Sequence, residues 1–366
     1  MTTIGVGMLG YAFMGKAHAN AYHQLAYMTW PPPLVPELIA VAGRDEAAVA
    51  EAARRYGFAS HVTDWRELIA DDRIGLLDNG GPNSLHSAPT IAAAEAGKHV
   101  LCEKPLGRNA AESREIFERV AAAGVVHMCA FNYRFVPAIR LARQILEAGD
   151  LGEIHHVRAR YLQSWAAAED PGVWRFNAEQ AGSGALGDLG THIIDLVRYL
   201  VGEPLSVSAL TRTFRDAPGL GEGGVDDAFA AAVEIEGGAI GTLEATRFAT
   251  GRINALQIEI NGSRGAIAFD MERMNELDVA RPKNFERILV TEPEHPFIEH
   301  WWPPGHILGW GATFLHEIHH LLRAIAGDGE VAPHGATLED GWRADEVAAA
   351  IARSAASGQR EAVAAV

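Results

Sequence analysis

The sequence predicts an α/β fold in two domains: an N-terminal doubly wound parallel sheet, then an α+β domain with a mostly antiparallel, open-faced sheet. Three observations favour this class. The chain of 366 residues exceeds the usual size of a single hydrophobic core. Its first third alternates short apolar runs with helical patterns, as parallel sheets with crossover helices do. Its second half pairs strand-like runs across glycine turns. We place the boundary between residues 134 and 135, so the domains span 1–134 and 135–366.

The first domain is predicted from the alternation of its elements. Apolar runs predict strands at 3–9, 37–43, 74–78, 98–103 and 125–132. Between them, two amphipathic patterns predict helices at 46–56 and 110–122. Because strands that alternate with helices pair in parallel, ligands are expected at the carboxyl ends of these strands.

The second domain is predicted from hairpins and longer helices. The patterns indicate a helix at 136–148, a strand at 154–163 and a helix at 186–201. The runs 230–236 and 239–246 flank Gly237-Gly238 and predict a hairpin. A second hairpin is expected to turn at Asn261-Gly262. With Ser263 this stretch also matches a glycosylation acceptor, but we interpret it as a turn.

The composition favours a small-molecule partner inside the cell. The net charge is −16 and the basic residues are scattered, which argues against nucleic acid or an anionic membrane as partner. Cys102 and Cys129 lie in apolar strand-like runs, as reduced packing thiols do. The N-terminus shows no basic segment followed by an apolar one, as a signal peptide would, and no apolar run is long enough to span a bilayer. We therefore expect a cytoplasmic protein.

The stretch "IGVGMLGYAFMGKAH" offers two frames for a phosphate-binding glycine turn. A turn at Gly5, Gly7 and Gly10 would leave only a very short β-strand before it, and it would place Gly15 in the interior of the following helix. A turn from Gly10 to Gly15 follows a full-length strand, and we take this frame. The middle glycine of the dinucleotide pattern is then Ala12. The turn predicts an NAD(P)-binding Rossmann domain, with a ligand-free tight turn as the alternative. The expected contacts are Gly10, Ala12, Phe13 and Met14.

The end of the second strand bears on the choice of cofactor. An acidic residue there binds the adenosine ribose in NAD enzymes, but this chain has Gly43 followed by Arg44. Arg44 is suited to a 2′-phosphate, so the residues favour NADP over NAD. Two other interpretations stay open: Arg44 stacks on adenine, or Asp45 reaches the ribose.

Two motifs carry groups for proton transfer. Lys104 in "CEKP" ends the fourth strand, at the edge where a nicotinamide is expected. Asp188 and His192 are four residues apart on a predicted helix, so the carboxylate is placed to orient the imidazole as a base. An ordinary helix salt bridge and a solvated lysine are the structural alternatives, and Asp195 is either exposed or structural.

Taken together, four segments resemble the Gfo/Idh/MocA oxidoreductases: 10–18, "GPNSLH" at 81–86, "EKP" at 103–105 and "DLGTH" at 188–192. The resemblance covers essentially the whole chain. The stretches "FMGKAHANAY", "HMCAFNYR", "YLQSW" and "WRF" are similar to the levoglucosan dehydrogenase group of sugar and glycoside 3-dehydrogenases. The chain departs from the pattern at Ala12, at Gly43 and at Asn79-Gly80-Gly81, and these departures concern the cofactor only.

The resemblance implies an NAD(P)-dependent enzyme, a homo-oligomer, that interconverts a secondary hydroxyl and a ketone on a sugar, anhydrosugar, glycoside or cyclitol. It implies that the catalytic residues are Lys104, Asp188 and His192. It implies that the cofactor also contacts Pro82, Asn83, His86, Glu103, Lys104 and Asn132. It implies that the sugar pocket is lined by Tyr133, Arg134, Tyr161, Gln163, Trp174, Arg175 and His192.

Three other functions are weighed against this one. Relatives that cleave glycosides by a transient redox step resemble this chain but lack the lysine, and regulators of the same fold lose the lysine or the histidine. "HEIHH" at 316–320 matches a zinc-protease pattern, but the same helix has the apolar periodicity of a packing helix. We therefore assign no metal. The loop at 292–311, rich in Trp, His and Pro, covers a ligand site or an oligomer contact, and from it His300, His306, Trp301, Trp302 and Trp310 are further candidates.

Overall fold

The computed structural model describes residues 1–168, 173–214 and 224–364. The chain forms two compact units, each described here by itself. The first consists of Met1–Gly107, Ala111–Phe135 and Gly309–Trp342, and the second of Arg108–Ala110, Val136–Leu308 and Arg343–Val366. The chain passes from the first unit into the long segment of the second after Phe135, one residue from the predicted boundary. Within the described residues, no helix has the length and apolarity needed to cross a bilayer.

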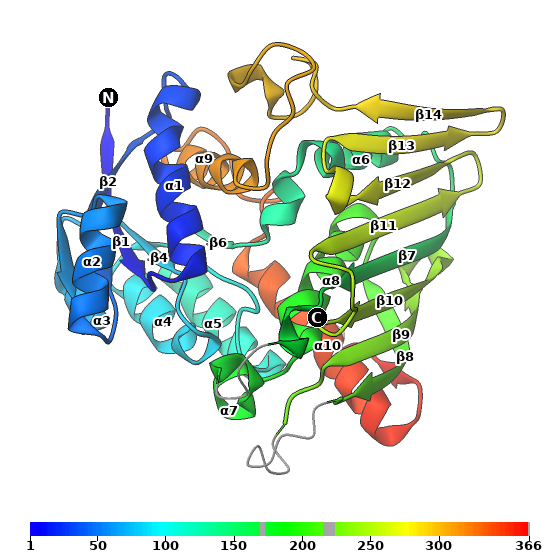
Figure 1. Cartoon of the computed structure of the whole chain (residues 1–366), viewed down its shortest axis with the longest axis horizontal. Helices are drawn as coiled ribbons and strands as arrows, with labels where there is room; N and C mark the ends of the chain where they lie inside the picture. Colours follow the sequence, from blue (N-terminus) through cyan, green and yellow to red (C-terminus); the bar gives the residue numbers. More distant parts are fainter. Residues whose placement is uncertain (169–172, 215–223, 365–366) are drawn as a thin grey trace. The chain divides into compact units, whose positions relative to one another are not determined.

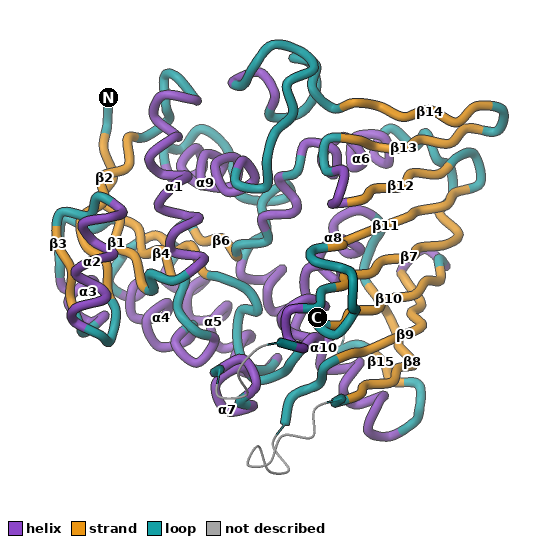
Figure 2. The backbone as a smooth tube through the Cα atoms, in the orientation of Figure 1, coloured by secondary structure: helices purple, strands orange, loops and turns teal. Residues whose placement is uncertain are grey.

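The first unit contains the predicted parallel sheet (Figures 1 and 2). In the described part of the chain this sheet has six strands, all paired in parallel, in the order β3-β2-β1-β4-β5-β6. The strands are β1 (Thr3–Leu9), β2 (Val35–Ala42), β3 (Ser60–Val62), β4 (Leu76–Asn79), β5 (His99–Cys102) and β6 (His127–Cys129). This order confirms the doubly wound class. The sequence pattern missed β3, which is only three residues long.

Helices connect these strands. They are α1 (Phe13–Met28), α2 (Glu46–Tyr56), α3 (Trp65–Ala70), α4 (Ser87–Glu95) and α5 (Ala110–Ala123). The bounds of α2 are set locally, because Asp45 caps its first turn and Gly57 ends it in the left-handed conformation. The unit also contains α9 (Ala312–Ile325), which packs on α1. Residues 309–342 belong to the first unit, whereas the predicted division placed them in the second domain. The sequence pattern could not show this, because it depends on packing between segments that are distant in the sequence.

The second unit contains a sheet of nine strands among the described residues, in the order β14-β13-β12-β11-β7-β10-β9-β8-β15. Its strands are β7 (Ile154–Leu162), β8 (Pro204–Arg212), β9 (Ala228–Ile235), β10 (Ile240–Thr246), β11 (Ala255–Gly262), β12 (Ala266–Asp270), β13 (Glu276–Arg281), β14 (Asn284–Leu289) and β15 (Glu361–Ala362). Of these pairings, that of β7 with β10 is parallel and the others are antiparallel. The mostly antiparallel prediction is therefore confirmed.

One predicted hairpin is displaced. β9 and β10 pair around Gly237-Gly238 as expected. β11 and β12 also pair, but Asn261 and Gly262 belong to β11, and the turn lies at Ser263-Arg264. The expected turn at Asn261-Gly262 was wrong because β11 stays paired with β7 through these two residues.

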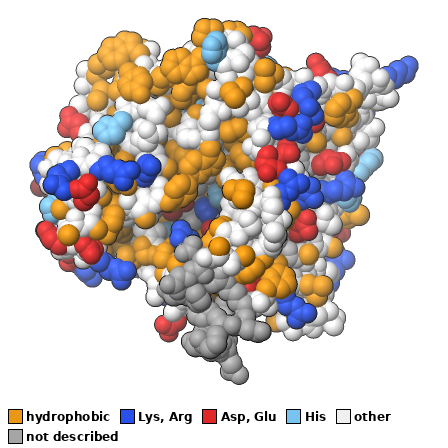
Figure 3. Space-filling view, viewed as in Figure 1, with side chains coloured by type: hydrophobic (Ala, Val, Ile, Leu, Met, Phe, Trp, Pro, Cys, Tyr) orange, Lys and Arg blue, Asp and Glu red, His pale blue; other side chains and the backbone are white. Residues whose placement is uncertain are grey.

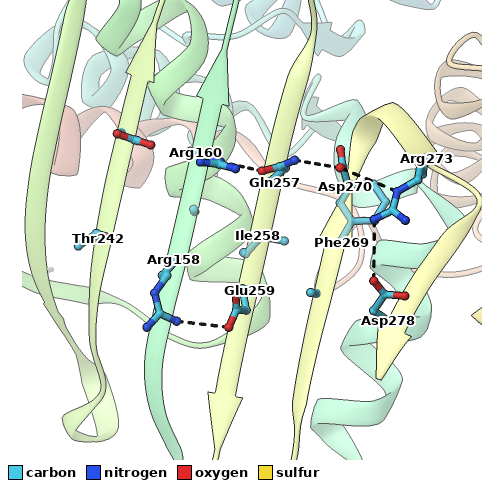
Figure 4. Close-up of a pocket in the computed structure, with 13 residues that line it drawn as sticks. Arg158, Arg160, Thr242, Gln257, Ile258, Glu259, Phe269, Asp270, Arg273 and Asp278 are labelled. Atoms are coloured by element: carbon cyan, nitrogen blue, oxygen red, sulfur yellow. Dashed lines mark hydrogen bonds and ion pairs between the residues drawn. The ribbon is translucent and has the colours of Figure 1, made fainter. Parts of the chain in front are cut away.

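Helices cover one face of the second sheet. The helices of this unit are α6 (Pro137–Glu147), α7 (Ala178–Ala181), α8 (Thr191–Leu200) and the larger part of α10 (Leu338–Ser357). On β7, Val157, Ala159 and Tyr161 are buried, whereas Arg158 and Arg160 between them are exposed. Because α8 packs on β7, the buried set faces the helices and the arginines lie on the opposite, open face. Figure 4 shows these arginines in front of the sheet.

Candidate functional site

The turn between β1 and α1 has the predicted frame. Gly10 adopts φ +95°, and a Cβ there would lie 2.5 Å from the carbonyl oxygen of Gly80. A Cβ on Gly15 would lie 2.3 Å from the carbonyl oxygen of Gly10. Ala12 precedes α1 and provides no side-chain cap, and the first turn holds no acidic residue. The N–H groups of this helix start therefore fit the phosphates of a dinucleotide.

The end of β2 shows why residue 43 is glycine. A Cβ on Gly43 would lie 2.0 Å from Cε1 of Tyr11, so the tyrosine ring occupies the space that a side chain would need. Tyr56 donates its hydroxyl hydrogen to the carbonyl oxygen of Tyr11 at 2.9 Å. Asp45 accepts the N–H of Ala48 at 2.9 Å and so serves α2 as its cap. The contact between Tyr11 and Gly43 had no sequence signal, because the two residues belong to different strand ends.

Arg44 follows Gly43 and is exposed. Within the described residues its guanidinium has no ion-pair partner, so its charge is available to an anion. This is the arrangement that a 2′-phosphate would use.

The loops after β4 and β5 are joined through His86. Its Nδ1 lies 2.8 Å from the carbonyl oxygen of Pro105, and its Nε2 lies 3.0 Å from that of Gly81. Burial lowers the pKa of His86 and so favours its neutral form. A neutral imidazole has one N–H, so it donates to one of these two oxygens at a time. Asn83, in the same loop, is also buried. His86 thus connects the segment at 81–86 with the "EKP" segment, and direct contacts of Pro82, Asn83 and His86 with a cofactor stay predictions.

Lys104 directly follows a buried carboxylate. Glu103 is 4% exposed, and its Oε2 accepts the backbone N–H of Lys104 at 3.1 Å. Burial alone would raise the pKa of Glu103, but His18 and then Lys104 outweigh it, and the pKa is lowered. Glu103 is therefore ionised beside the lysine, which makes it a support for Lys104 as well as a candidate cofactor contact.

The segment at 132–134 is buried in the first unit. Asn132 donates its side-chain N–H to Oγ1 of Thr313 at 2.9 Å. Arg134 is 3% exposed and donates to Oδ1 of Asp340 at 3.1 Å. Tyr133 is also buried. These contacts give Asn132 and Arg134 roles in packing, and their contacts with cofactor or sugar, like that of Tyr133, stay predictions.

Asp188 and His192 lie on either side of a helix junction. The predicted single helix at 186–201 is a π-helix, Leu186–Gly190, continued by α8. Such π-turns are frequent at functional sites. His192 is buried and Asp188 is half-buried, whereas Asp195 is buried on α8, which supports its structural interpretation.

Asp226 holds the start of this helix, and sequence reasoning missed it. Its carboxylate accepts the N–H of Gly184 and the N–H of Leu186, each at 2.7 Å. A Cβ on Gly184 would lie 1.7 Å from the carbonyl oxygen of Asp226, so only glycine fits there. Burial raises the pKa of Asp226. Asp226 therefore fixes the segment that carries Asp188 and His192.

Tyr161 and Gln163 form a polar group beside His192. The rings of Tyr161 and His192 meet edge to face, with centroids 5.8 Å apart. The Tyr161 hydroxyl donates to Oδ1 of Asn254 at 2.6 Å, and Nε2 of Gln163 donates to the same oxygen at 2.7 Å. This group is suited to binding hydroxyls of a sugar next to the imidazole. Asn254 lies in the loop before β11 and belongs to no sequence motif.

The remaining aromatic and histidine candidates have identifiable partners. Arg175 lies 4.7 Å above the ring of the half-buried Trp174, and Trp165 packs on the buried Phe176. His306 contacts the carbonyl oxygen of Pro303 within its own loop. His300 lies 3.3 Å from the carboxylate of its neighbour Glu299, and Trp301 contacts Trp302 edge to face. Trp310 stacks on Phe13 of the first unit, with centroids 5.3 Å apart.

The histidines of "HEIHH" contact backbone carbonyls. Nδ1 of His316 lies 3.0 Å from the oxygen of Phe135, and Nε2 of His320 lies 2.8 Å from the oxygen of Val331. In the described part of the chain, no group of three or more His, Cys, Asp or Glu residues is arranged to hold a metal ion.

A hollow of about 390 Å³ lies on the open face of the second sheet (Figure 4). Arg158 pairs with Glu259, Arg160 donates to Gln257, and Gln257 donates to Asp270. Figure 3 shows basic and acidic side chains next to each other over this sheet. The hollow contains none of the predicted site residues, and among its charged side chains Arg273 pairs with Asp270 and Asp278 as Arg158 does with Glu259.

Comparisons with known proteins cover both units. The NAD-binding Rossmann-fold model of the oxidoreductase family GFO/IDH/MocA matches residues 4–131, and the GFO/IDH/MocA C-terminal domain model matches residues 139–268. Levoglucosan dehydrogenase of Pseudarthrobacter phenanthrenivorans is 42% identical over 381 residues, which cover 97% of this chain and 97% of that protein. Inositol 2-dehydrogenase of Rhizobium meliloti is 28% identical with the same coverage.

Solved structures show the same likeness. Levoglucosan dehydrogenase in complex with NADH and levoglucosan matches with a TM-score of 0.94 and 42% identity. An oxidoreductase domain protein from Kribbella flavida matches with a TM-score of 0.94 and 43% identity. Both matches cover 100% of each chain.

Proposed function

Because this chain belongs to the Gfo/Idh/MocA family of NAD-binding oxidoreductases, we propose that it interconverts a secondary hydroxyl and a ketone on a carbohydrate. The substrate class is a sugar, anhydrosugar, glycoside or cyclitol. Among these we place an anhydrosugar of the levoglucosan type first as the candidate substrate. One observation carries this choice: 42% identity to levoglucosan dehydrogenase across 97% of both proteins, in a chain that has Lys104, Asp188 and His192 in the family's motifs.

We assign the proton-transfer step to the second unit and its support to the first. His192 takes the proton of the substrate hydroxyl, and Asp188 orients the imidazole and stabilises its charged form. Lys104 holds the hydroxyl oxygen and assists the proton transfer. The chemistry that a bound nicotinamide would supply is acceptance of the hydride from the carbinol carbon. In the reverse direction the same residues return the proton.

Recognition of the sugar is assigned to polar and aromatic side chains. Tyr161 and Gln163, held by Asn254, lie beside His192 and are placed to bind neighbouring hydroxyls. Trp174 with Arg175 provides a flat face for a pyranose ring. The proposal also includes Tyr133 and Arg134, although Arg134 already pairs with Asp340.

A substrate panel tests the proposal. Purified protein is incubated with NAD or NADP and with levoglucosan, free sugars, cyclitols and aryl glycosides, while reduced cofactor and released aglycone are both followed. We expect formation of reduced cofactor and a keto sugar. Aglycone release without net reduced cofactor would instead show redox-assisted glycoside cleavage, and binding of cofactor without turnover would show a regulator.

For the cofactor, we propose that Arg44 gives this chain affinity for the 2′-phosphate of NADP. The support is the missing acid at Gly43 and the exposed guanidinium beside it. The levoglucosan dehydrogenase structures include complexes with NADH, so a preference for NADP would be a property of residues in this chain. Titration with NAD and NADP, on wild type and Arg44→Ala, tests this. Loss of NADP affinity alone supports the assignment, and a clear NAD preference in wild type contradicts it.

We also propose a cytoplasmic homo-oligomer, dimer or tetramer. The two cysteines are buried and form no disulfide, which suits a reducing compartment. The second sheet exposes apolar side chains, among them Leu210, Ile240 and Phe285, which suits contact with another copy. Light scattering of the purified protein measures the mass, and a monomer at micromolar concentration would contradict the oligomer.

A further inference from the structure

His18 on α1 is completely buried between two carboxylates of the first unit. Its Nδ1 lies 2.9 Å and 3.0 Å from the two carboxylate oxygens of Asp78, the third residue of β4. Its Nε2 lies 3.2 Å from Oε1 of Glu103, which follows β5, at an angle too poor for a well-formed hydrogen bond. The mechanism above assigns no role to this residue.

An imidazole placed between two acceptors is best satisfied as a cation. Only the imidazolium has an N–H on both nitrogens, and a buried carboxylate is costly without a positive partner. Burial alone would lower the pKa of His18, but Asp78 and then Glu103 outweigh it, and the pKa is raised well above 6.5. The charge of His18 therefore compensates both acids.

Tyr22 and Glu317 are further polar groups beside this cluster, and the neutral ring of His86 lies near Glu103. Tyr22, one turn along α1, is buried near Asp78, and Glu317 of α9 also acts on it. Burial, Asp78 and Glu317 raise the pKa of Tyr22 well above 10.0, so its hydroxyl keeps its proton. The ring of Phe314, also on α9, packs on that of His18, with centroids 5.3 Å apart.

Glu103 connects this cluster to Lys104. Its Oε1 is the atom nearest to His18, and its Oε2 accepts the backbone N–H of Lys104 at 3.1 Å. The ammonium of Lys104 also acts on the charge of Glu103. One carboxylate is thus shared between the buried histidine and the proposed catalytic lysine.

We propose that His18 is a positioning residue, which as a cation between Asp78 and Glu103 fixes the Glu103 carboxylate and, through it, Lys104. The inference rests on the proposed role of Lys104 in the reaction. Without the cation, Lys104 is the counter-charge left for Glu103 among the described residues, so the lysine is drawn towards this carboxylate and away from its working position.

Two isosteric substitutions separate positioning from packing. The amide nitrogen of Asn lies near the place of Nδ1, and that of Gln near the place of Nε2. His18→Asn keeps a donor towards Asp78 and loses the one towards Glu103, whereas His18→Gln keeps a donor towards Glu103. We expect kcat to fall by about 10²-fold in His18→Asn and much less in His18→Gln, with KM for the cofactor unchanged. His23→Asn, on the exposed part of the same helix, is the matched control.

A second readout needs no turnover. The chain has four lysines, at 16, 98, 104 and 283, so competitive acylation followed by peptide mass spectrometry reports each one separately. In His18→Asn, the acylation of Lys104 at a fixed pH is expected to be slower than in wild type, because the lysine is held against Glu103, while that of Lys283, in the second unit, stays the same. If His18→Asn does not fold, His18→Gln and Glu103→Gln carry the test, because the variant without the Glu103 charge no longer holds Lys104 and makes its acylation faster at the same pH.

The outcomes distinguish this inference from the proposed function. A shift of Lys104 acylation supports the inference even if the substrate panel finds no carbohydrate oxidised. If instead a sugar is oxidised and Lys104→Ala is inactive, but folded His18→Asn has wild-type kcat and wild-type Lys104 acylation, then His18 only packs and the inference is overturned. Equal loss of kcat in His18→Asn and His18→Gln, with acylation unchanged, would overturn it as well.

Discussion

Lys104 is the residue on which the proposed chemistry depends most. It follows β5 at the carboxyl edge of the first sheet, where doubly wound folds bind their ligands. Its backbone N–H is held by Glu103, and Glu103 is in turn next to His18. These contacts hold the backbone at Lys104, whose side chain is half-buried.

Lys104→Ala is therefore predicted to stop turnover while leaving cofactor binding intact. Loss of a positioned proton-transfer group costs about 10²–10⁴-fold in kcat. Steady-state kinetics on the best sugar and cofactor fluorescence measure the two effects. Lys283→Ala, in the exposed turn between β13 and β14, is the control and keeps full activity. An active Lys104→Ala protein would remove the residue from the site.

Gly43 provides a second prediction at the residue scale. Gly43→Asp would introduce the acid usual in NAD enzymes, but its Cβ would meet the Tyr11 ring. We expect the single variant to lose stability by about 1–3 kcal/mol, as overpacked sites do. Adding Tyr11→Ala should restore stability and raise affinity for NAD. Urea denaturation and NAD titration check both, and a stable Gly43→Asp protein would show that the ring is not fixed there.

At the scale of elements, the π-helix and α8 depend on their first turn. Asp226 accepts the N–H groups of Gly184 and Leu186, so two donors at the helix start share one half-buried carboxylate as their partner. The helix that carries Asp188 and His192 is thus fixed at its beginning by a residue 38 positions later than Asp188.

Gly184→Ala is predicted to be destabilising by more than 1 kcal/mol and to lower kcat, because the new Cβ collides with the backbone of Asp226. Gly309→Ala is the control, since nothing lies within 4 Å of its added Cβ. Thermal unfolding and kinetics measure the effects. Equal stability of the two variants would contradict the account of this turn.

Elements with local signals could be predicted, and those that depend on distant contacts could not. β1 and α2 have the expected bounds, because the glycine turn ends the first and Asp45 and Gly57 bound the second. The pairing of β11 with β7 overrode the turn signal of Asn261-Gly262. The predicted site residues carry motifs, whereas Asp226, Asn254 and the contact of Tyr11 with Gly43 arise from tertiary packing and have no pattern of their own.

At the scale of the whole molecule, the buried His18 cluster predicts how stability depends on pH. The pKa of His18 is raised, so its contribution is complete below 6.5 and is lost as the pH rises through the folded-state value. The pKa of Glu103 is lowered, so its contribution is complete above 4.5 and is lost as the pH falls through its folded-state value.

We therefore expect the stability difference between wild type and His18→Asn to be largest between about pH 4.5 and 6.5 and to shrink at higher pH. Urea denaturation of both proteins across this range measures the difference. A difference that grows as the pH rises above 6.5 would show that His18 is neutral in the folded protein.

The central claim is that Lys104 and His192 act together on one substrate hydroxyl. The most direct measurement is kcat for Lys104→Ala, His192→Ala and the double variant on the same sugar. Residues that act as one unit lose activity non-additively, so the double variant is predicted to be about as slow as the slower single variant. Losses that multiply in the double variant, or a single variant with wild-type kcat, would contradict the claim.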